Sequence, residues 1–173
     1  FIDKIFPEPD LQDYVLNIVA ESLDGMPKRE ELFVCSGSGS NGKSQFFGFL
    51  QKVFGEYAGK TQPTLLTRKR NDTGSANPEM YDLRGKRIVY CEEPDDNESF
   101  KSGILKEPTG GDYITARTLF KHNVTFKPQF KLFISCNDKP DISSTDEGTW
   151  RRIKVILFIS KFVDPYDYRL NDK

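Results

Sequence analysis

One glycine-rich octapeptide constrains this chain more than any other feature. Residues 37–44 read Gly-Ser-Gly-Ser-Asn-Gly-Lys-Ser and satisfy the pattern G-x-x-x-x-G-K-[ST]. A short apolar run precedes them and a run with helical periodicity follows, which is the context that a phosphate-binding loop requires. Glycines allow a tight turn, so that successive backbone N–H groups and the helix N-terminus point at one anion. The octapeptide therefore predicts a nucleotide-phosphate site made by Gly37, Ser38, Gly39, Ser40, Asn41, Gly42, Lys43 and Ser44.

Two side chains of the octapeptide carry specific chemistry. Lys43 is expected to neutralise the β- and γ-phosphates of a nucleotide, and the Ser44 hydroxyl is expected to bind Mg²⁺. ATP and Mg²⁺ are therefore the expected cofactors.

Further polar positions follow two other strand-like runs. Residues 87–91 lead into Glu92 and Glu93. One carboxylate can hold Mg²⁺ through its water shell while the other polarises the attacking water, and the sequence leaves open which does which. Residues 131–136 are followed by Asn137, whose amide can hydrogen-bond the attacking water or the γ-phosphate. The predicted catalytic set is thus Lys43, Glu92, Glu93 and Asn137, with Ser44, Glu92 and Glu93 around the metal.

The three cysteines point to the fold class. Cys35, Cys91 and Cys136 each end a short apolar run and are far apart in sequence, so buried thiols at strand ends fit better than a disulfide framework or a zinc motif. Apolar strands alternate with helical segments, which predicts an α/β fold with a mostly parallel central sheet sandwiched by helices. Ligands bind such sheets beyond the carboxyl ends of the strands. We therefore expect the three cysteine-ended strands to lie side by side, with the predicted catalytic residues converging on one triphosphate.

The remaining elements follow from periodicity and from turn residues. They are a helix from Asp10, which can cap it, to Gly25, which ends it; a helix over 42–54; polar, loop-like chain over 59–80, with a brief helix over 78–83; a helix over 100–106; and an inserted β-hairpin made of runs 113–119 and 124–127.

The formal net charge of −1 gives no whole-molecule argument for nucleic acid, so any DNA site must be a local basic patch. Between Asp112 and Lys131 several residues are basic and none is acidic, and the predicted hairpin lies in this stretch. A lysine can meet a phosphate, and an aromatic ring can stack on a base. The predicted DNA-binding residues are Arg117, Phe120, Lys121 and His122, and the basic run Arg68-Lys69-Arg70 is a second candidate patch.

Taken together, these residues resemble the superfamily 3 helicases, especially the primase-helicases of large DNA viruses, poxviruses included, and of related phages and plasmids. The resemblance rests on the GSGSNGKS form of the loop, on residues 106–117 (KEPTGGDYITAR) and on residues 149–153 (TWRRI). These motifs follow one another in the family's order over roughly residues 30–160. Pro108 stands where the family usually has an apolar residue, which leaves the end of the local helix open.

The resemblance implies a modified AAA+ core that works as a hexameric ring, with ATP bound between neighbours. An arginine of one copy then stabilises charge at the nucleotide of the next, and the family pattern assigns this role to Arg152, with Arg151 as the alternative. It also implies that the hairpin carries Lys121 and His122 into the ring channel, where they draw single-stranded DNA along. A DNA fork and a primase domain in the same polypeptide are the other expected partners.

The chain is expected to divide into a helical lead-in (1–28), the superfamily 3 ATPase domain (29–162) and an extension (163–173), all cut from a longer protein. No apolar stretch approaches the ~18 residues of a membrane span, and no signal-peptide pattern occurs, so we expect a protein that is not secreted and that lies in the cytoplasm or at a viral replication site in the host cell. The hypothesis is an ATP-dependent DNA helicase motor of viral or phage replication. The alternative is an AAA+-type DNA-binding or loading module that does not unwind DNA. A small-molecule P-loop kinase is disfavoured by the paired acids and the basic hairpin.

Overall fold

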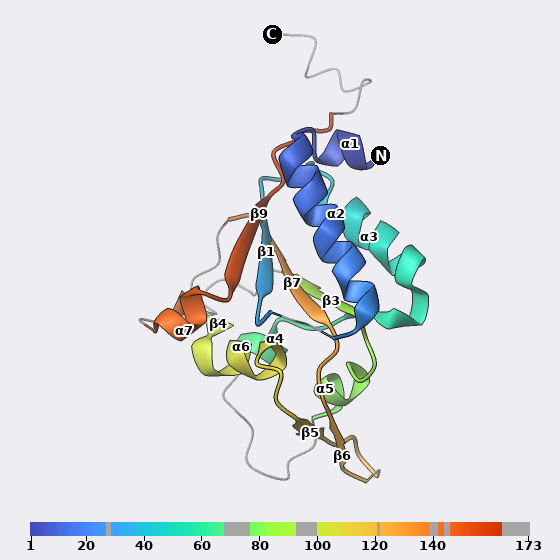
Figure 1. Cartoon of the computed structure of the whole chain (residues 1–173), viewed down its shortest axis with the longest axis vertical. Coiled ribbons are helices and arrows are strands. Elements are labelled where there is room, and N and C mark those ends of the chain that lie inside the picture. Colours follow the sequence, from blue (N-terminus) through green and yellow to red (C-terminus); the bar gives the residue numbers. More distant parts are fainter. Residues whose placement is uncertain are drawn as a thin grey trace.

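A five-stranded, wholly parallel sheet forms the centre of the molecule (Figure 1). The computed structural model describes residues 1–26, 29–67, 77–92, 100–120, 122–138, 142–143 and 146–163. In spatial order the strands are β2 (Ala58–Lys60), β3 (Ile88–Glu92), β7 (Lys131–Cys136), β1 (Leu32–Ser36) and β9 (Ile153–Leu157). The predicted α/β fold with a parallel sheet is confirmed.

Helices cover both faces of this sheet. The helices on one face are α1 (Ile2–Ile5), α2 (Pro9–Asp24) and α3 (Lys43–Phe54), and those on the other are α4 (Thr64–Thr67), α5 (Pro78–Asp82) and α6 (Ser102–Thr109). Successive strand residues alternate between the two cores, because side chains of a β-strand point to opposite faces. In β1, Phe33 and Cys35 belong to the core under α2 and α3, whereas Leu32 and Val34 belong to the other core. The predicted covering of both faces is therefore confirmed.

The start of α2 differs from the prediction. Glu8 occupies the position before the helix and makes no side-chain capping bond, and Pro9 is the first helical residue. Proline suits that position because its missing N–H is not needed there. Asp10 thus lies inside the first turn, and its predicted capping role is wrong. Gly25, with φ of 65°, ends the helix as predicted.

Residues 59–80 contain more regular structure than predicted. Strand β2 pairs with β3 at the edge of the sheet, a short 3-10 helix (Gly55–Tyr57) precedes it, and α4 follows. Residues 58–60 are Ala-Gly-Lys and lack the alternation of apolar and polar residues that predicts a strand. Their strand conformation depends on pairing with β3. The helix predicted over residues 100–106 is α6, which begins later, at Ser102. It continues through Pro108 to Thr109.

A second, smaller β-structure lies outside the main sheet. Strands β5 (Ile114–Ala116) and β6 (Val124–Phe126) pair antiparallel, as predicted, and project at the lower end of Figure 1. Their exposed faces are joined by the Thr115 and Thr125 hydroxyls, 2.9 Å apart. The short strands β4 (Phe100–Lys101) and β8 (Ile142–Ser143) pair with each other, and α7 (Glu147–Trp150) precedes β9.

The cysteines behave as predicted. Cys35, Cys91 and Cys136 are buried, and among the described residues none of them forms a disulfide. Burial raises the pKa of Cys91 to about 12 and that of Cys35 still further, so both remain neutral thiols at physiological pH. Within the described ranges, none of the helices has the length and hydropathy that crossing a bilayer requires.

Candidate functional site

The three cysteine-ended strands lie side by side, in the order β3, β7, β1. Glu92 is in register with Ser135, and Ser135 is in register with Cys35. Since neighbouring strands lie about 4.8 Å apart, the ends of β1 and β3 are separated by roughly 10 Å. Polar residues that follow these strands thus share one edge of the sheet, which is the arrangement predicted from the sequence.

The glycine-rich loop is fastened to the end of the neighbouring strand β7. The Gly37 N–H donates to the Asn137 carbonyl oxygen at 3.2 Å, and the Ser36 hydroxyl donates to the same oxygen at 3.3 Å. A Cβ atom at Gly37 would lie 2.4 Å from the Phe158 carbonyl oxygen and 2.5 Å from Asn41 Nδ2. Glycine is therefore required where the loop leaves β1, because the backbone passes so close to these groups.

Asn41 shapes the second half of the loop from inside. It is buried, its Oδ1 accepts from the Lys43 N–H at 3.3 Å, and its Nδ2 donates to Phe158 O at 3.5 Å. Gly42 then takes φ of 88°, a left-handed conformation that favours glycine, and helix α3 begins at the next residue. The loop thus delivers the chain directly into the N-terminus of a twelve-residue helix.

Lys43 is turned back over the loop rather than out into solvent. Its side chain is only 7 % exposed, and its ammonium donates to the Gly37 carbonyl oxygen. Ser38, Gly39, Ser40 and Ser44 are exposed. Lys43 is thus a positive charge held inside the loop, and because the outer residues of the loop are open to solvent, an anion can bind there.

The acid at the end of β3 has a basic partner. Lys60 Nζ on the edge strand β2 lies 2.7 Å from Glu92 Oε1, and both side chains are largely exposed. The hydrogen bond to Glu92 raises the pKa of Lys60 above its ordinary value. Sequence reasoning missed Lys60, since it lies in a segment without a strand pattern. Glu93 lies outside the described residues, and the side chain of Asn137 is exposed.

An apolar hollow of about 460 Å³ lies beside the loop. It is lined by Phe1, Lys4, Ile5, Ser40, Gly42, Gln45, Phe162 and Val163. The chain after β9 closes one side, because the Phe162 N–H donates to Ser40 O at 2.7 Å and Lys161 Nζ donates to Gly39 O at 2.8 Å. The sequence offers no pattern for this hollow, whose walls come from opposite ends of the chain.

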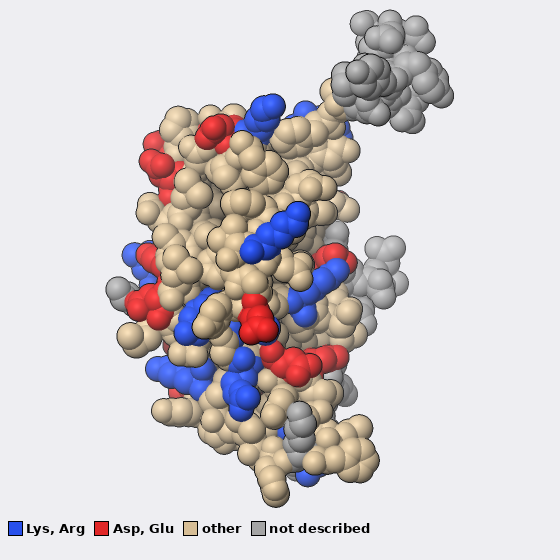
Figure 2. Space-filling view, turned by 90° about the vertical axis from the view of Figure 1, so that its right-hand side faces the viewer, with Lys and Arg blue, Asp and Glu red and all other residues tan. Residues whose placement is uncertain are grey.

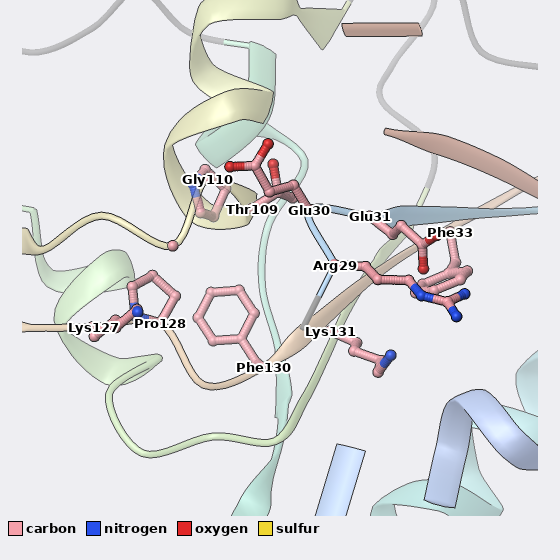
Figure 3. A pocket seen from close by; sticks show the side chains of 12 residues that line it. Arg29, Glu30, Glu31, Phe33, Thr109, Gly110, Lys127, Pro128, Phe130 and Lys131 are labelled. Carbon is pink, nitrogen blue, oxygen red and sulfur yellow. The ribbon is translucent and has the colours of Figure 1, made fainter. Parts of the chain in front are cut away.

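The opposite, amino edge of the sheet carries the arginine pair. Arg152 directly precedes β9, its side chain is 11 % exposed, and it forms an ion pair with Glu30. Arg151 is 69 % exposed and lies 3.2 Å from the same carboxylate oxygen. A smaller hollow of about 210 Å³ opens at this edge, with Glu30 and Glu31 among its lining residues (Figure 3). Neither arginine is near the glycine-rich loop of its own chain, because β1 and β9 separate the two edges.

The hairpin presents part of the predicted DNA site. Phe120 has φ of 61° and is fully exposed, and Arg117 and His122 are exposed beside it. Lys121 lies outside the described residues, as does the run Arg68-Lys69-Arg70. Lys131, at the end of the basic stretch, is buried and paired with Glu21 at 2.8 Å, so it faces the protein. On the face seen in Figure 2, described basic and acidic side chains are interspersed.

Comparisons with known proteins identify a family. Residues 35–152 match the model of a family of unknown function, DUF5906. A protein of Acanthamoeba polyphaga mimivirus named "Putative helicase" is 43% identical over 163 residues, which are 94% of this chain and 17% of that protein. A Frog virus 3 protein of the same name is 38% identical over 170 residues, or 95% of this chain and 17% of that protein. An African swine fever virus protein named "Putative primase" is 28% identical over 154 residues, which are 88% of this chain and 16% of that protein.

The fold also occurs in a solved structure. The apo C-terminal region of NrS-1 superposes with a TM-score of 0.65 over 92% of this chain and 36% of that chain, at 20% identity. Such a likeness concerns the fold. The chain spans about a sixth of the length of the viral relatives, so it matches one part of much longer proteins.

Proposed function

Because this chain belongs to the DUF5906 family, whose viral relatives carry helicase and primase names, we propose that it is the ATP-hydrolysing motor of a DNA helicase in viral replication. The observation that carries the proposal is the common edge at which the glycine-rich loop, Glu92 and Asn137 follow three adjacent strands.

ATP binding follows from the loop. The phosphates lie against the loop N–H groups and the N-terminus of α3, and Lys43 exchanges the Gly37 carbonyl for a phosphate oxygen. Ser44, exposed at the start of the helix, supplies a hydroxyl to Mg²⁺. The apolar hollow beside the loop offers Phe1, Ile5 and Phe162 to the nucleotide base.

Hydrolysis also requires the polar residues at the ends of β3 and β7. One of Glu92 and Glu93 would hold Mg²⁺ through its water shell and the other would polarise the attacking water, and Asn137 would orient that water or the γ-phosphate. Glu92 would exchange Lys60 for the water shell of Mg²⁺, and its carboxylate is open to the metal because the ion pair with Lys60 is exposed. The residues present fit a magnesium site that is completed by the nucleotide, since Mg²⁺ in such sites takes few protein ligands and several waters.

Assembly and DNA binding complete the proposed motor. The likeness to superfamily 3 proteins and their AAA+ core favours a hexameric ring, in which the arginine pair before β9 reaches the nucleotide of the next copy. The exposed Phe120, with Arg117, His122 and Lys121, contacts single-stranded DNA in the channel. A primase domain belongs to the same polypeptide in this proposal.

The test measures ATP hydrolysis and unwinding of a forked DNA duplex by the complete protein. Lys43→Ala is expected to lower both by about 10²–10³, because a preorganised cation at the phosphates is lost. Lys52→Ala is the matched control, since Lys52 is an exposed lysine in the last turn of the same helix. ATP hydrolysis without unwinding by the wild-type protein would instead support the loading-module alternative.

A further inference from the structure

The segment that follows β9 lies along the glycine-rich loop. We call residues 158–163 the strap, which leaves the end of β9 and passes beside α1 (Figure 1). At its start the Phe158 N–H donates to Ser36 O at 2.8 Å, and Phe158 O accepts from the Asn41 side chain. Further on, the Ser160 hydroxyl donates to two carbonyl oxygens at the end of α1, at 2.8 and 3.1 Å. The strap is therefore fixed both to the loop and to the N-terminal helix.

Two further bonds from the strap hold successive carbonyl groups of the loop. Lys161 Nζ donates to Gly39 O at 2.8 Å, and the Phe162 N–H donates to Ser40 O at 2.7 Å. In a planar trans peptide the N–H points away from the C=O of the same unit. Because both carbonyls face the strap, the Ser40 N–H and the Asn41 N–H face the opposite side of the loop.

These two N–H groups have no other use in the chain. Among the described residues, neither the Ser40 N–H nor the Asn41 N–H donates to a backbone or side-chain acceptor. The Gly37 N–H, by contrast, already donates to Asn137 O. Donors that are aimed before a ligand arrives need no reorganisation when it binds. The strap thus acts on the part of the loop whose donors remain for an anion.

The backbone of the loop depends on these contacts for its shape. Ser40 has φ of 62°, in the left-handed region that is unfavourable for a residue with a Cβ atom. Such conformations persist where surrounding contacts fix them, and they gather at functional sites. At Gly39 nothing lies within 4 Å of the Cβ position, so packing does not orient this peptide unit. The bond from Lys161 is the contact that turns the Gly39 carbonyl toward the strap.

We propose that the strap positions the loop for phosphate binding, and that Lys161 does so by holding Gly39 O on the strap side, with the Ser40 N–H directed to the phosphates. The inference rests on the proposed function and adds to that site a residue outside the octapeptide. Lys161 is a positioning residue, because its ammonium binds the loop and acts on the ligand through the loop.

The experiment uses the complete protein with Lys161→Met, Lys161→Arg and, as the matched control, Lys52→Met. Affinities for ATP and for pyrophosphate, kcat for ATP hydrolysis and the thermal unfolding midpoint are measured for each. Pyrophosphate separates the loop from the apolar hollow, because it carries phosphates and no base. Lys52 is a fitting control because it is also an exposed lysine, and it makes no ion pair among the described residues.

Lys161→Met is expected to weaken ATP and pyrophosphate binding by the same factor, roughly 3- to 10-fold, because one orienting hydrogen bond is lost. At saturating ATP, kcat stays within about twofold of the wild-type value, because the bound phosphates themselves align the loop. The unfolding midpoint is unchanged, since Lys161 is exposed. Lys161→Arg retains a charged donor and restores both affinities, and Lys52→Met binds both ligands as the wild type does.

Three outcomes would overturn the inference. They are wild-type pyrophosphate affinity in Lys161→Met, a loss confined to ATP, which would assign Lys161 to the base hollow, and an equal loss in Lys52→Met, which would reduce the effect to net charge. Each of these leaves the proposed function standing. A wild-type protein that binds neither ATP nor pyrophosphate would instead overturn the proposed function, and the inference with it.

Discussion

The two edges of the sheet are built in contrasting ways. At the carboxyl edge the functional groups are tied to one another: Lys43 binds Gly37, the loop binds Asn137, and Glu92 binds Lys60. At the amino edge Arg152 is enclosed and paired with Glu30, but Arg151 is exposed, and on the hairpin Phe120 is fully exposed. The carboxyl edge thus has a loop that its own contacts hold in place, whereas the amino edge and the hairpin carry side chains that are open to solvent.

The contrast has a physical basis. A loop that must turn its N–H groups toward an anion needs its backbone fixed in advance, and buried contacts such as those of Asn41 supply that order. A group that reaches a neighbour or a DNA strand needs to be exposed and free to move. The predictions below test this division, beginning with the largest expected effect.

Glu92→Gln is expected to separate binding from hydrolysis at the carboxyl edge. The loop still binds ATP, but kcat falls by about 10²–10⁴, because an amide neither holds the metal as tightly nor accepts a proton. Nucleotide binding and steady-state hydrolysis measure the two effects. Glu56→Gln, an exposed acid before β2, serves as the control. Wild-type ATP hydrolysis by the Glu92→Gln variant would show that the acid at the end of β3 takes no part in the reaction.

Gly37→Ala tests whether the carboxyl edge is preorganised by close packing. The added Cβ meets the Phe158 carbonyl at 2.4 Å, and such overpacking costs roughly 1–3 kcal/mol of unfolding free energy. Gly39→Ala is the matched control, since nothing lies within 4 Å of its Cβ position. Chemical denaturation compares the two, and equal stabilities would mean that the loop adapts freely.

Phe120→Ala tests the outward-facing hairpin. Loss of one stacked base is expected to weaken single-stranded DNA binding by about 1–3 kcal/mol, with stability unaffected because the ring is fully exposed. Leu119→Ala removes an exposed apolar side chain without a π-face and should weaken binding less. Fluorescence anisotropy with a labelled oligonucleotide measures both, and equal losses would argue against stacking.

Lys60→Met gives the smallest expected effect. The pair with Glu92 is exposed, so the unfolding free energy should change by less than about 1 kcal/mol. Since the pKa of Lys60 is raised above 10.5, the contribution is present below that pH and is lost as pH rises through the raised value. Denaturation at neutral and strongly alkaline pH checks this sign. A larger loss of unfolding free energy at neutral pH would show that strand β2 depends on the ion pair between Lys60 and Glu92.

Local patterns made much of this molecule predictable. The run 131–136 coincides with strand β7, the octapeptide is followed by helix α3 as expected, and the two strands of the hairpin pair. Each of these features is encoded within a few residues, by apolar periodicity or by glycines that a turn requires. Because ligands bind parallel sheets beyond the carboxyl ends of the strands, the polar residues there predicted that the three cysteine-ended strands would be neighbours.

Other features arise only from the tertiary structure. Strand β2 forms because β3 offers it a partner, and this pairing is what brings Lys60 to Glu92. Glu30 meets the arginine pair, more than a hundred residues away in sequence, because β1 and β9 are adjacent. The sequence by itself determined the cysteine-ended strands of the sheet and the glycine-rich turn that leads into α3. Contacts between side chains depend on the order of the strands in space, which no local periodicity encodes.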